Sequence, residues 1–337
     1  MTPLNSPRKI AQFTVNPTGL GCMNLDHAYG PSVSAEQGER VLLGALDAGY
    51  DFFDTATLYG GGKNETRIGQ VLAKHRNRYV LASKCGMAMV QQNDGSFKRV
   101  IDGRPATIKK QCEDSLRRLN TDVMDLYYLH RWDKNVPIED TVGAMSDLVR
   151  EGKIQTIGLS EVGQATLRKA HAVHPIAALQ TEYSLWTRDA EIAVLKVTQE
   201  LGIAFVAFSP VARGFLCGLR DLSGLDAKDI RRTMGRFQAD NYAANLKLQD
   251  NYARIAQQLD CTQAQLALAW LLHRAPHIVT IPGTTRVEHM QENIAAQNIS
   301  LSADTMHQLD MLINPTSVKG MRYDPQSQSE VDTEHLT

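Results

Sequence analysis

The ten residues "LDAGYDFFDT" (46–55) contain the junction on which the predicted fold depends. A helix-like apolar pattern ends at Gly49, and a short strand-like run, Phe52-Phe53, follows. Glycine after a helix can take the left-handed conformation that turns the chain out of the helix. The same junction recurs in "VREGKIQTIGLS" (149–160) and "QELGIAFVAFS" (199–209). We therefore expect a repeated unit of helix, glycine and strand.

Further strand-like runs lie on both sides of these junctions, and amphipathic segments separate nearly all of them. They are "GLGCM" (19–23), "RYVLASK" (78–84), "MDLYYLH" (124–130), "AALQTEY" (177–183) and "HIVTIPG" (277–283). With the three junction strands they predict eight strands. Strands that alternate with helices indicate a parallel sheet, and eight units favour a closed (β/α)₈ TIM barrel over an open sheet. We expect one domain over residues 1–337.

The first predicted helix begins at Ser34, which can cap it, with Gln37 at the capping-box position. Further amphipathic faces occur in 107–119, 139–150, 163–173, 189–201, 262–273 and 287–297. Residues 1–7 and 321–337 are polar and lack periodicity, so we expect loosely ordered tails. Two long loops, 86–106 and 217–238, are expected at the carboxyl-terminal face of the barrel, where such loops are often functional.

The composition is that of a soluble globular protein, with 43% hydrophobic and 22% charged residues in a chain of 337. The formal net charge is −1 and no long basic block occurs, so nucleic acid is not an expected partner. Neither a signal peptide nor a run of about 18 apolar residues is present, and no membrane association is expected. Five scattered cysteines without a C-x-x-C pair predict reduced thiols and a cytoplasmic location. Nothing in the sequence indicates an oligomeric state.

Two stretches resemble nucleotide-binding motifs, but each lacks a required residue. "GLGCMN" (19–24) has Asn24 where a dinucleotide fold requires a third glycine, and polar residues separate it from the next helix. "YGGGKN" (59–64) has Asn64 where a phosphate-binding loop requires Ser or Thr. Both motifs therefore disfavour an open nucleotide-binding sheet.

Catalytic groups of a (β/α)₈ barrel lie at the carboxyl ends of its strands. Here Asp54, Lys84 and His130 end three consecutive strands of the predicted sheet, and Tyr59 follows Asp54 closely. A phenol is a slow acid at neutral pH unless a nearby cation stabilises its anion, and Lys84 is the candidate cation. Asp54 would keep Lys84 charged, and His130 could orient a substrate oxygen. This set predicts proton donation to a carbonyl oxygen that receives a hydride at carbon.

These motifs also carry a resemblance to a known family. "GLGCMNLDHAYG", "DFFDTATLYGGGKNE", "LASKCG", "DLYYLHRWD", "IGLSEV", "QTEYSLWTRD", "VAFSPVARGFLCG" and "IPGTTRVEHMQENI" resemble, in order, the motifs of the aldo-keto reductase family over roughly residues 8–315. The resemblance implies a (β/α)₈ barrel that uses NADPH (NADP⁺) to reduce an aldehyde or ketone. It matches Asp54, Tyr59, Lys84 and His130 to the family's catalytic tetrad, with Tyr59 as the general acid.

The same matching implies a set of cofactor contacts. Ser160 and Gln180 would hold the carboxamide, and Phe208 would stack on the nicotinamide. The remaining expected contacts are Gly21, Met23, Ser209, Val211, Arg213, Gly214, Leu216, Gly283, Thr284, Thr285, Arg286, His289, Glu292 and Asn293. The segment "IPGTT" also has a physical reason to bind the cofactor phosphate. It leads into a helix whose free N–H groups attract an anion, and Arg286 adds a positive charge.

Two positions depart from the family pattern. Glu161 follows Ser160 where much of the family has asparagine, so the contact to the carboxamide is expected to differ. Gly283 stands where some branches carry lysine, so selection of NADPH over NADH is expected to depend on Arg286. Tyr29 and Trp132 are the expected walls of the substrate pocket.

Two alternatives stay open beside the reductase. The barrel could be a regulatory module that senses cofactor, with vestigial catalysis; its discriminator is the tetrad, which is complete here. A metal-dependent lyase on the same barrel would need clustered His and carboxylate ligands at strand ends, and His130 has no second histidine at such a position. No metal site is therefore expected.

Overall fold

The structure is a computed structural model that describes residues 4–92 and 94–335. Its centre is a sheet of parallel strands in the order β12-β11-β10-β9-β8-β5-β4-β3. The strands are β3 (Leu20–Gly21), β4 (Phe52–Asp54), β5 (Val80–Cys85), β8 (Met124–Leu129), β9 (Ile154–Ser160), β10 (Ile176–Glu182), β11 (Ala204–Phe208) and β12 (Ile278–Thr280). Each overlaps a predicted strand, so the parallel sheet is confirmed.

The first and last strands meet and close the sheet. Parallel bridges join Thr18 to Thr280 and Gly21 to Gly283. A Cβ atom on Gly21 would lie 2.7 Å from the carbonyl oxygen of Ile281, and one on Gly283 would lie 2.6 Å from the side-chain oxygen of Asn24. Glycine at both positions lets the two backbones approach closely. The predicted closed (β/α)₈ barrel is therefore confirmed.

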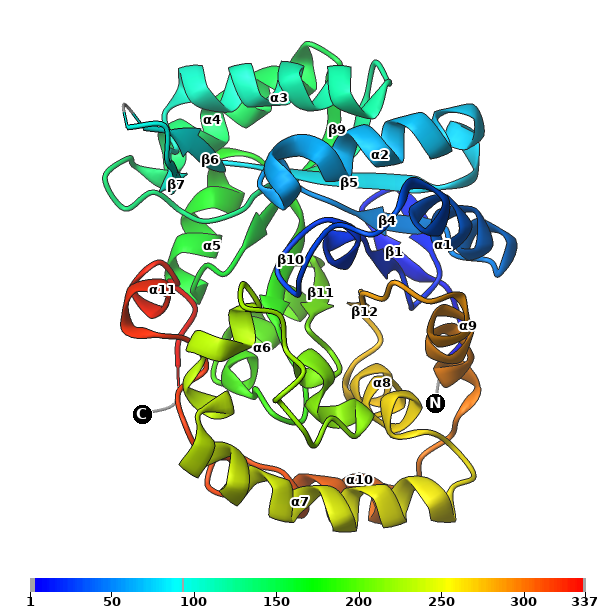
Figure 1. The fold of residues 1–337 in the computed structure, drawn as a ribbon. Coiled ribbons are helices and arrows are strands. Elements are labelled where there is room, and N and C mark those ends of the chain that lie inside the picture. The colour runs from blue at the N-terminus through cyan, green and yellow to red at the C-terminus, as the bar shows by residue number, and fades with distance from the viewer. Residues whose placement is uncertain (1–3, 93, 336–337) are drawn as a thin grey trace.

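Helices form an outer ring around the strands (Figure 1). They are α1 (Ala35–Asp47), α2 (Lys63–Leu72), α3 (Pro105–Leu119), α4 (Ile138–Arg150), α5 (Gln164–Val173), α6 (Val194–Glu200), α7 (Ala239–Gln258), α8 (Gln263–Arg274), α9 (Val287–Ala295), α10 (Ala303–Leu312) and α11 (Pro325–Ser329). Ser34 caps α1 as predicted, because its hydroxyl accepts a hydrogen bond from the Gln37 N–H.

The predicted helices do not include α2, α7, α10 or α11. Polar side chains occupy buried positions in two of them, Asn64 and Glu65 in α2 and Asn245 and Gln249 in α7. Apolar periodicity is a weak guide to a helix whose buried face is partly polar.

The barrel interior is filled from the strands and closed at one end by an antiparallel hairpin. Strands β1 (Arg8–Ile10) and β2 (Phe13–Val15) form this hairpin. Ile10 and Val15 are fully buried in one apolar cluster with alternate residues of the barrel strands. The catalytic candidates stand at the opposite ends of those strands.

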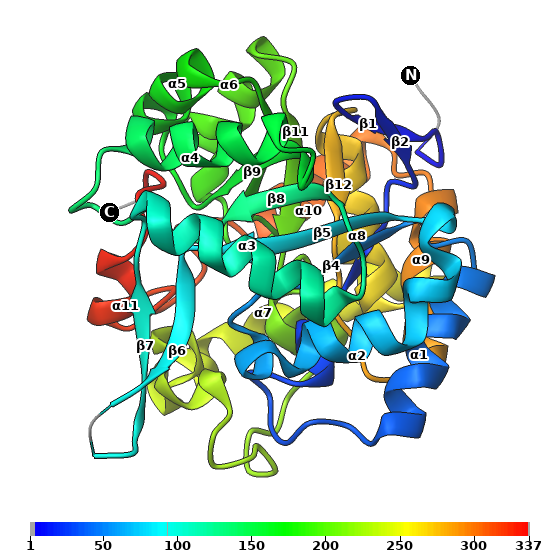
Figure 2. The same ribbon diagram turned by 90° about the horizontal axis from the view of Figure 1, so that it is seen from above.

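The expected long loop 86–106 is largely a second antiparallel hairpin, formed by β6 (Met87–Gln91) and β7 (Phe97–Ile101). It projects from the body of the barrel (Figure 2). The other loop, 217–238, is irregular apart from two short 3₁₀ turns, Ile230–Thr233 and Gly235–Phe237.

Residues 321–335, expected to form a loose tail, are instead packed against the barrel. Arg322 is 5% exposed, and Val331 and Thr333 are also buried. Ion pairs rather than an apolar stripe hold this segment, which is why hydrophobic periodicity does not reveal it. Residues 1–3 and 336–337 of the expected tails lie outside the described residues. No helix among residues 4–92 and 94–335 is long and apolar enough to cross a membrane.

Candidate active site

Lys84 stands at the centre of a buried polar cluster at the carboxyl ends of β4, β5 and β8. Its side chain is fully buried. The ammonium donates to the Asp54 carboxylate, to the Thr55 carbonyl oxygen at 2.8 Å and to the Tyr59 hydroxyl at 3.3 Å. His130 joins the cluster through its ring, which lies edge-on to that of Tyr59. The structure therefore brings together the four residues that the strand ends predict.

Asp54 is held from two sides. One carboxylate oxygen pairs with Lys84, and the other accepts a hydrogen bond of 2.8 Å from the Gln180 side-chain amide. Burial raises the pKa of Asp54, and the Lys84 charge opposes that rise. Burial alone would lower the pKa of Lys84, but the charges of Asp54 and Tyr59 outweigh it and raise that pKa above its ordinary value. Lys84 therefore remains an ammonium at neutral pH.

The position of Tyr59 depends on the three glycines that follow it. Gly60, Gly61 and Gly62 have φ angles of 58°, 63° and 91°. This left-handed backbone conformation is unfavourable for residues that carry a side chain. The chain then enters α2, and the Tyr59 hydroxyl is left beside Lys84. Burial raises the pKa of the phenol, while the nearby ammonium pulls it down. The phenol thus carries its proton at neutral pH.

His130 is a neutral imidazole. Burial lowers its pKa well below 6.5, and the charges of Lys84 and Arg131 lower it further. Its backbone N–H donates to the Cys85 carbonyl oxygen at 2.8 Å, but its Nδ1 atom is buried without a hydrogen-bond partner among the described residues. Buried ring nitrogens normally find a partner, so an unpaired Nδ1 atom at this position is unusual.

The loop after β11 has an unusual backbone. Ser209, Ala212, Arg213 and Gly214 all have positive φ angles, between 49° and 96°. Arg213, an expected cofactor contact, is buried, and its guanidinium donates to Glu182 at 2.8 Å and to the Tyr29 hydroxyl at 3.4 Å. Leu216 is fully buried, so its side chain serves the core.

A cavity of about 710 Å³ lies beside this loop. Its lining includes the expected cofactor residues Val211, Gly283, Thr284, His289, Glu292 and Asn293. Arg286 stands at the start of α9, where no side chain caps the helix, and its own side chain is 63% exposed. Thr285 is fixed from α1, because its carbonyl oxygen accepts a hydrogen bond of 2.6 Å from Gln37.

The remaining expected residues are placed as follows. Ser160 ends β9, pairs in register with Gln180 and has its hydroxyl 3.3 Å from Arg131. Met23 packs against the apolar cluster that contains Tyr59, and Phe208 packs on the barrel interior. Trp132 donates through its indole N–H to the Val136 carbonyl oxygen at 2.9 Å, which ties it to its own loop.

Three residues near the site, His27, Asn64 and Arg67, make contacts that the sequence prediction does not include. His27 stacks on Tyr59 with ring centroids 5.7 Å apart. Asn64 and Arg67 of α2 hold the loop after β3: Asn64 donates to the Cys22 carbonyl oxygen and to Asp26, and Arg67 forms a two-pronged ion pair with Asp26. These hydrogen bonds explain why asparagine stands at position 64, where a phosphate-binding loop would have Ser or Thr.

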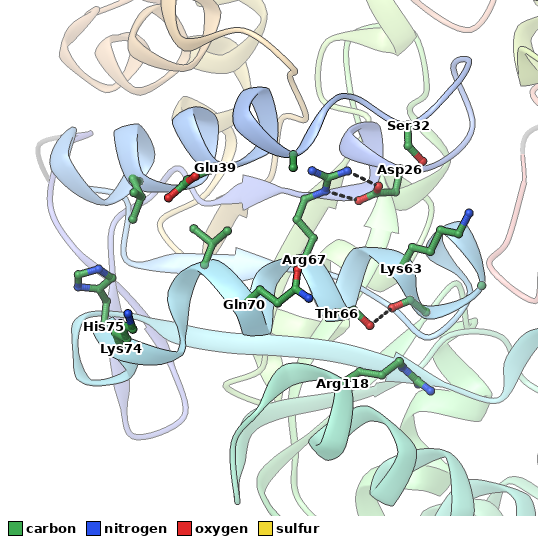
Figure 3. Close-up of a pocket in the computed structure, with 15 residues that line it drawn as sticks. Asp26, Ser32, Glu39, Lys63, Thr66, Arg67, Gln70, Lys74, His75 and Arg118 are labelled. Atoms are coloured by element: carbon green, nitrogen blue, oxygen red, sulfur yellow. Dashed lines mark hydrogen bonds and ion pairs between the residues drawn. The ribbon is translucent and has the colours of Figure 1, made fainter.

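Arg67 and Asp26 also line a groove of about 790 Å³ between α1 and α2 (Figure 3). None of the predicted site residues lines it, so it is separate from the polar cluster around Lys84. Among the described residues, no group of three or more His, Cys, Asp or Glu side chains is arranged to hold a metal ion.

Comparison with known proteins gives a consistent match. The sequence pattern of the Aldo/keto reductase family matches residues 17–314. A curated soybean (Glycine max) protein named "Probable aldo-keto reductase 1" is 39% identical over 312 residues, which covers 92% of this chain and 89% of that protein.

Solved structures of the same family have the same fold. A glycerol dehydrogenase from Gluconobacter oxydans superposes with a TM-score of 0.83 at 26% identity, covering 93% of this chain and 95% of that one. An aldo-keto reductase from Klebsiella pneumoniae, solved in complex with NADPH, gives a TM-score of 0.73 at 28% identity and covers 95% and 99% of the two chains.

Proposed function

Because the chain belongs to the aldo/keto reductase family, we propose that it reduces the carbonyl group of an aldehyde or a ketone to an alcohol with NADPH, and that Tyr59 donates the proton. The observation that carries this proposal is the contact of one buried ammonium, that of Lys84, with both the Asp54 carboxylate and the Tyr59 hydroxyl.

The Lys84 ammonium serves proton transfer from Tyr59. When the phenol gives up its proton, a buried phenolate is left, and burial alone makes that anion unfavourable. A cation at 3.3 Å stabilises the phenolate and so makes the phenol a better acid. Asp54 keeps the cation charged and in place, and Gln180 fixes Asp54.

His130 is suited to orient the substrate. A neutral imidazole can offer a ring N–H to a carbonyl oxygen without competing for the proton that Tyr59 delivers. A hydrogen-bond donor beside the oxygen also stabilises the negative charge that develops there during reduction.

The cavity beside the β11 loop and the start of α9 have features that fit NADPH. When bound, the cofactor supplies a hydride to the carbonyl carbon. The cavity of about 710 Å³ has the volume typical of a small-molecule site. The uncapped start of α9 offers N–H groups to phosphate, and the exposed Arg286 offers a charge. The NADPH-bound structure from Klebsiella pneumoniae supports the choice of cofactor.

Tyr29 and Trp132 remain our proposed walls of the substrate pocket, and the substrate class is a small carbonyl compound. We also propose a cytoplasmic location. Its support is that all five cysteines are free thiols, which suits a reducing compartment.

The proposal is tested with the purified protein in one cuvette. NADPH and NADH are titrated by fluorescence, and a reactive aromatic aldehyde is then added while the absorbance of the reduced nicotinamide is followed. We expect saturable NADPH binding and oxidation that depends on the aldehyde. Binding without oxidation would favour a cofactor-sensing module, and absence of NADPH binding would contradict the assigned cofactor.

A further inference from the structure

Four buried charges lie at or beside the proposed cofactor residues, and none of them belongs to the tetrad. Glu161 follows Ser160, Glu182 ends β10, Arg213 lies in the loop after β11, and Arg322 comes from the carboxyl-terminal segment. Each is at most 8% exposed. Buried charges are costly unless they are paired, so the pairing among these four is a structural requirement.

Glu161 faces the carboxyl-terminal segment. One carboxylate oxygen lies 2.6 Å from the Arg322 guanidinium and accepts from the Glu182 N–H at 2.9 Å. The other accepts from the Thr333 hydroxyl at 3.1 Å. The Glu161 backbone is left-handed, with φ of 56°, so the turn directly after Ser160 is itself strained. At position 161, where much of the family has asparagine, the carboxylate thus has a charged partner in Arg322.

Glu182 extends the pairing toward the cofactor loop. Its carboxylate lies 3.4 Å from Arg322 and 2.8 Å from Arg213. The charges therefore alternate along the path Glu161, Arg322, Glu182, Arg213. Arg322 is the charged link between the turn after Ser160 and the left-handed loop that contains Arg213, and it lies beside the direct hydrogen bond from the Glu182 N–H to Glu161.

The segment that carries Arg322 crosses several loops at this end of the barrel. The Tyr323 hydroxyl lies 3.3 Å from Arg213, and Glu330 pairs with Arg99 of the β6–β7 hairpin at 2.6 Å. Lys134, in the loop after β8, donates to the Ser329 carbonyl oxygen at 2.9 Å. Figure 2 shows α11 beside β7, in agreement with these contacts.

We propose that Arg322 is a positioning residue for the cofactor, holding Glu161 and Glu182 so that Ser160 and the Arg213 loop keep the geometry that binds NADPH. This inference rests on the proposed function. Without Arg322, the buried carboxylates of Glu161 and Glu182 lose the positive charge that lies between them. The turn after Ser160 and the Arg213 loop are then held less firmly and can shift. The main consequence falls on cofactor affinity, because Arg322 has no contact with the tetrad.

The test compares NADPH binding and turnover in Arg322→Gln, Arg322→Lys and wild type. For Arg322→Gln we expect the Kd for NADPH to rise about tenfold or more, while kcat at saturating NADPH falls by less than about threefold. Arg322→Lys keeps the positive charge on a side chain of different shape, so its Kd for NADPH should lie between those of wild type and Arg322→Gln. This conservative variant also keeps the test valid if Arg322→Gln does not fold.

Arg76→Gln is the matched control. Arg76 pairs with Asp125 at 2.7 Å and donates to the Tyr79 carbonyl oxygen, at the starting ends of the strands. It should lower the melting temperature while leaving the Kd for NADPH within about twofold of wild type.

Glu161→Gln gives an independent check. If Arg322 acts through Glu161, the effects of Glu161→Gln and Arg322→Gln on NADPH affinity are not additive in the double variant.

The outcomes separate the two proposals. A wild type that oxidises NADPH, with both Arg322 variants of wild-type affinity, would overturn the positioning role alone. A wild type that does not bind NADPH would overturn the proposed function and this inference with it.

Discussion

Lys84 illustrates how a single residue sets the chemistry of the site. A fully buried lysine is rare, because removal of an ammonium from water is costly. Three acceptors compensate here, the Asp54 carboxylate, the Thr55 carbonyl oxygen and the Tyr59 hydroxyl. Because water is excluded around it, the buried charge acts strongly on the Tyr59 hydroxyl at 3.3 Å.

Arg286 is the residue on which we expect the choice between NADPH and NADH to depend. Its side chain is exposed and lies 3.7 Å from Glu288, a weak pairing that leaves the guanidinium able to bind a phosphate. For Arg286→Ala we expect the Kd for NADPH to rise about tenfold or more and that for NADH to change by less than about twofold.

Fluorescence titration with both cofactors measures this preference. Arg150→Ala, which removes a similarly exposed arginine from α4, is the control and should leave both affinities unchanged. Equal losses for NADPH and NADH in Arg286→Ala would refute the assignment.

Residue identity predicts part of this site and not the rest. Asp54, Lys84 and His130 could be predicted because the ends of parallel strands meet at one face of a barrel. The hydrogen bond from Gln180 to Asp54 joins residues 126 positions apart, and it depends on which side chains the closed barrel turns inward. The stacking of His27 on Tyr59 likewise depends on how the loop after β3 folds.

At the scale of elements, the seam between β3 and β12 has little room for a larger residue. Gly21→Ala places a Cβ atom 2.7 Å from the Ile281 carbonyl oxygen, a backbone contact that cannot move without opening the seam. Overpacking of this kind costs about 1–3 kcal/mol, so we expect a lower free energy of unfolding.

Denaturant unfolding measures the effect of Gly21→Ala against Gly143→Ala. Gly143 lies within α4 with open space around its Cβ position. Its replacement should leave stability unchanged or raise it by about 0.5–1 kcal/mol through helix propensity. A Gly21→Ala variant as stable as wild type would contradict the account of barrel closure.

Sequence patterns predict some of the helices and miss others. The helices with an apolar stripe could be predicted, whereas α2 and α7 bury asparagine, glutamate or glutamine against partners that the sequence does not reveal. In α2, Glu65 accepts from Ser83 of β5 at 2.5 Å and pairs with Arg118 of α3 at 2.7 Å. Such pairings follow from the tertiary structure and not from a local period.

For the whole molecule, the carboxyl-terminal segment is the main difference between prediction and structure. A polar segment without periodicity is normally a tail. Here its charges pair with Glu161 and Glu182, which belong to strand ends about 140–160 residues earlier in the chain, a distance over which sequence alone gives no pairing rule. The consequence is a link from the last residues to the proposed cofactor site.

The same charges make the stability of the molecule depend on pH. Burial opposes ionisation of Glu182, but the charges of Arg213 and Arg322 prevail and hold its pKa at about 2. An unfolded glutamate titrates near 4.3. Between these values the unfolded chain binds the proton more tightly, so stability is lost as the pH falls from about 4.5 to about 2.

Glu182→Gln removes this contribution, which is worth about 3 kcal/mol at neutral pH by the size of the pKa shift. We expect the variant to be less stable at pH 7 and its stability to fall less steeply below pH 4.5. Urea unfolding at several pH values measures both. Glu288→Gln, at an exposed site, should keep the wild-type slope, and the same slope in Glu182→Gln would refute the assignment.

The most direct test of the central claim is single-turnover reduction of an aromatic aldehyde by Tyr59→Phe beside the wild type, with NADPH affinity measured on the same samples. The account predicts that the Kd for NADPH stays within about twofold while the rate of reduction falls by about 100-fold or more, because only the proton donor is lost. A Tyr59→Phe variant that reduces the aldehyde at nearly the wild-type rate would show that the proton comes from another group.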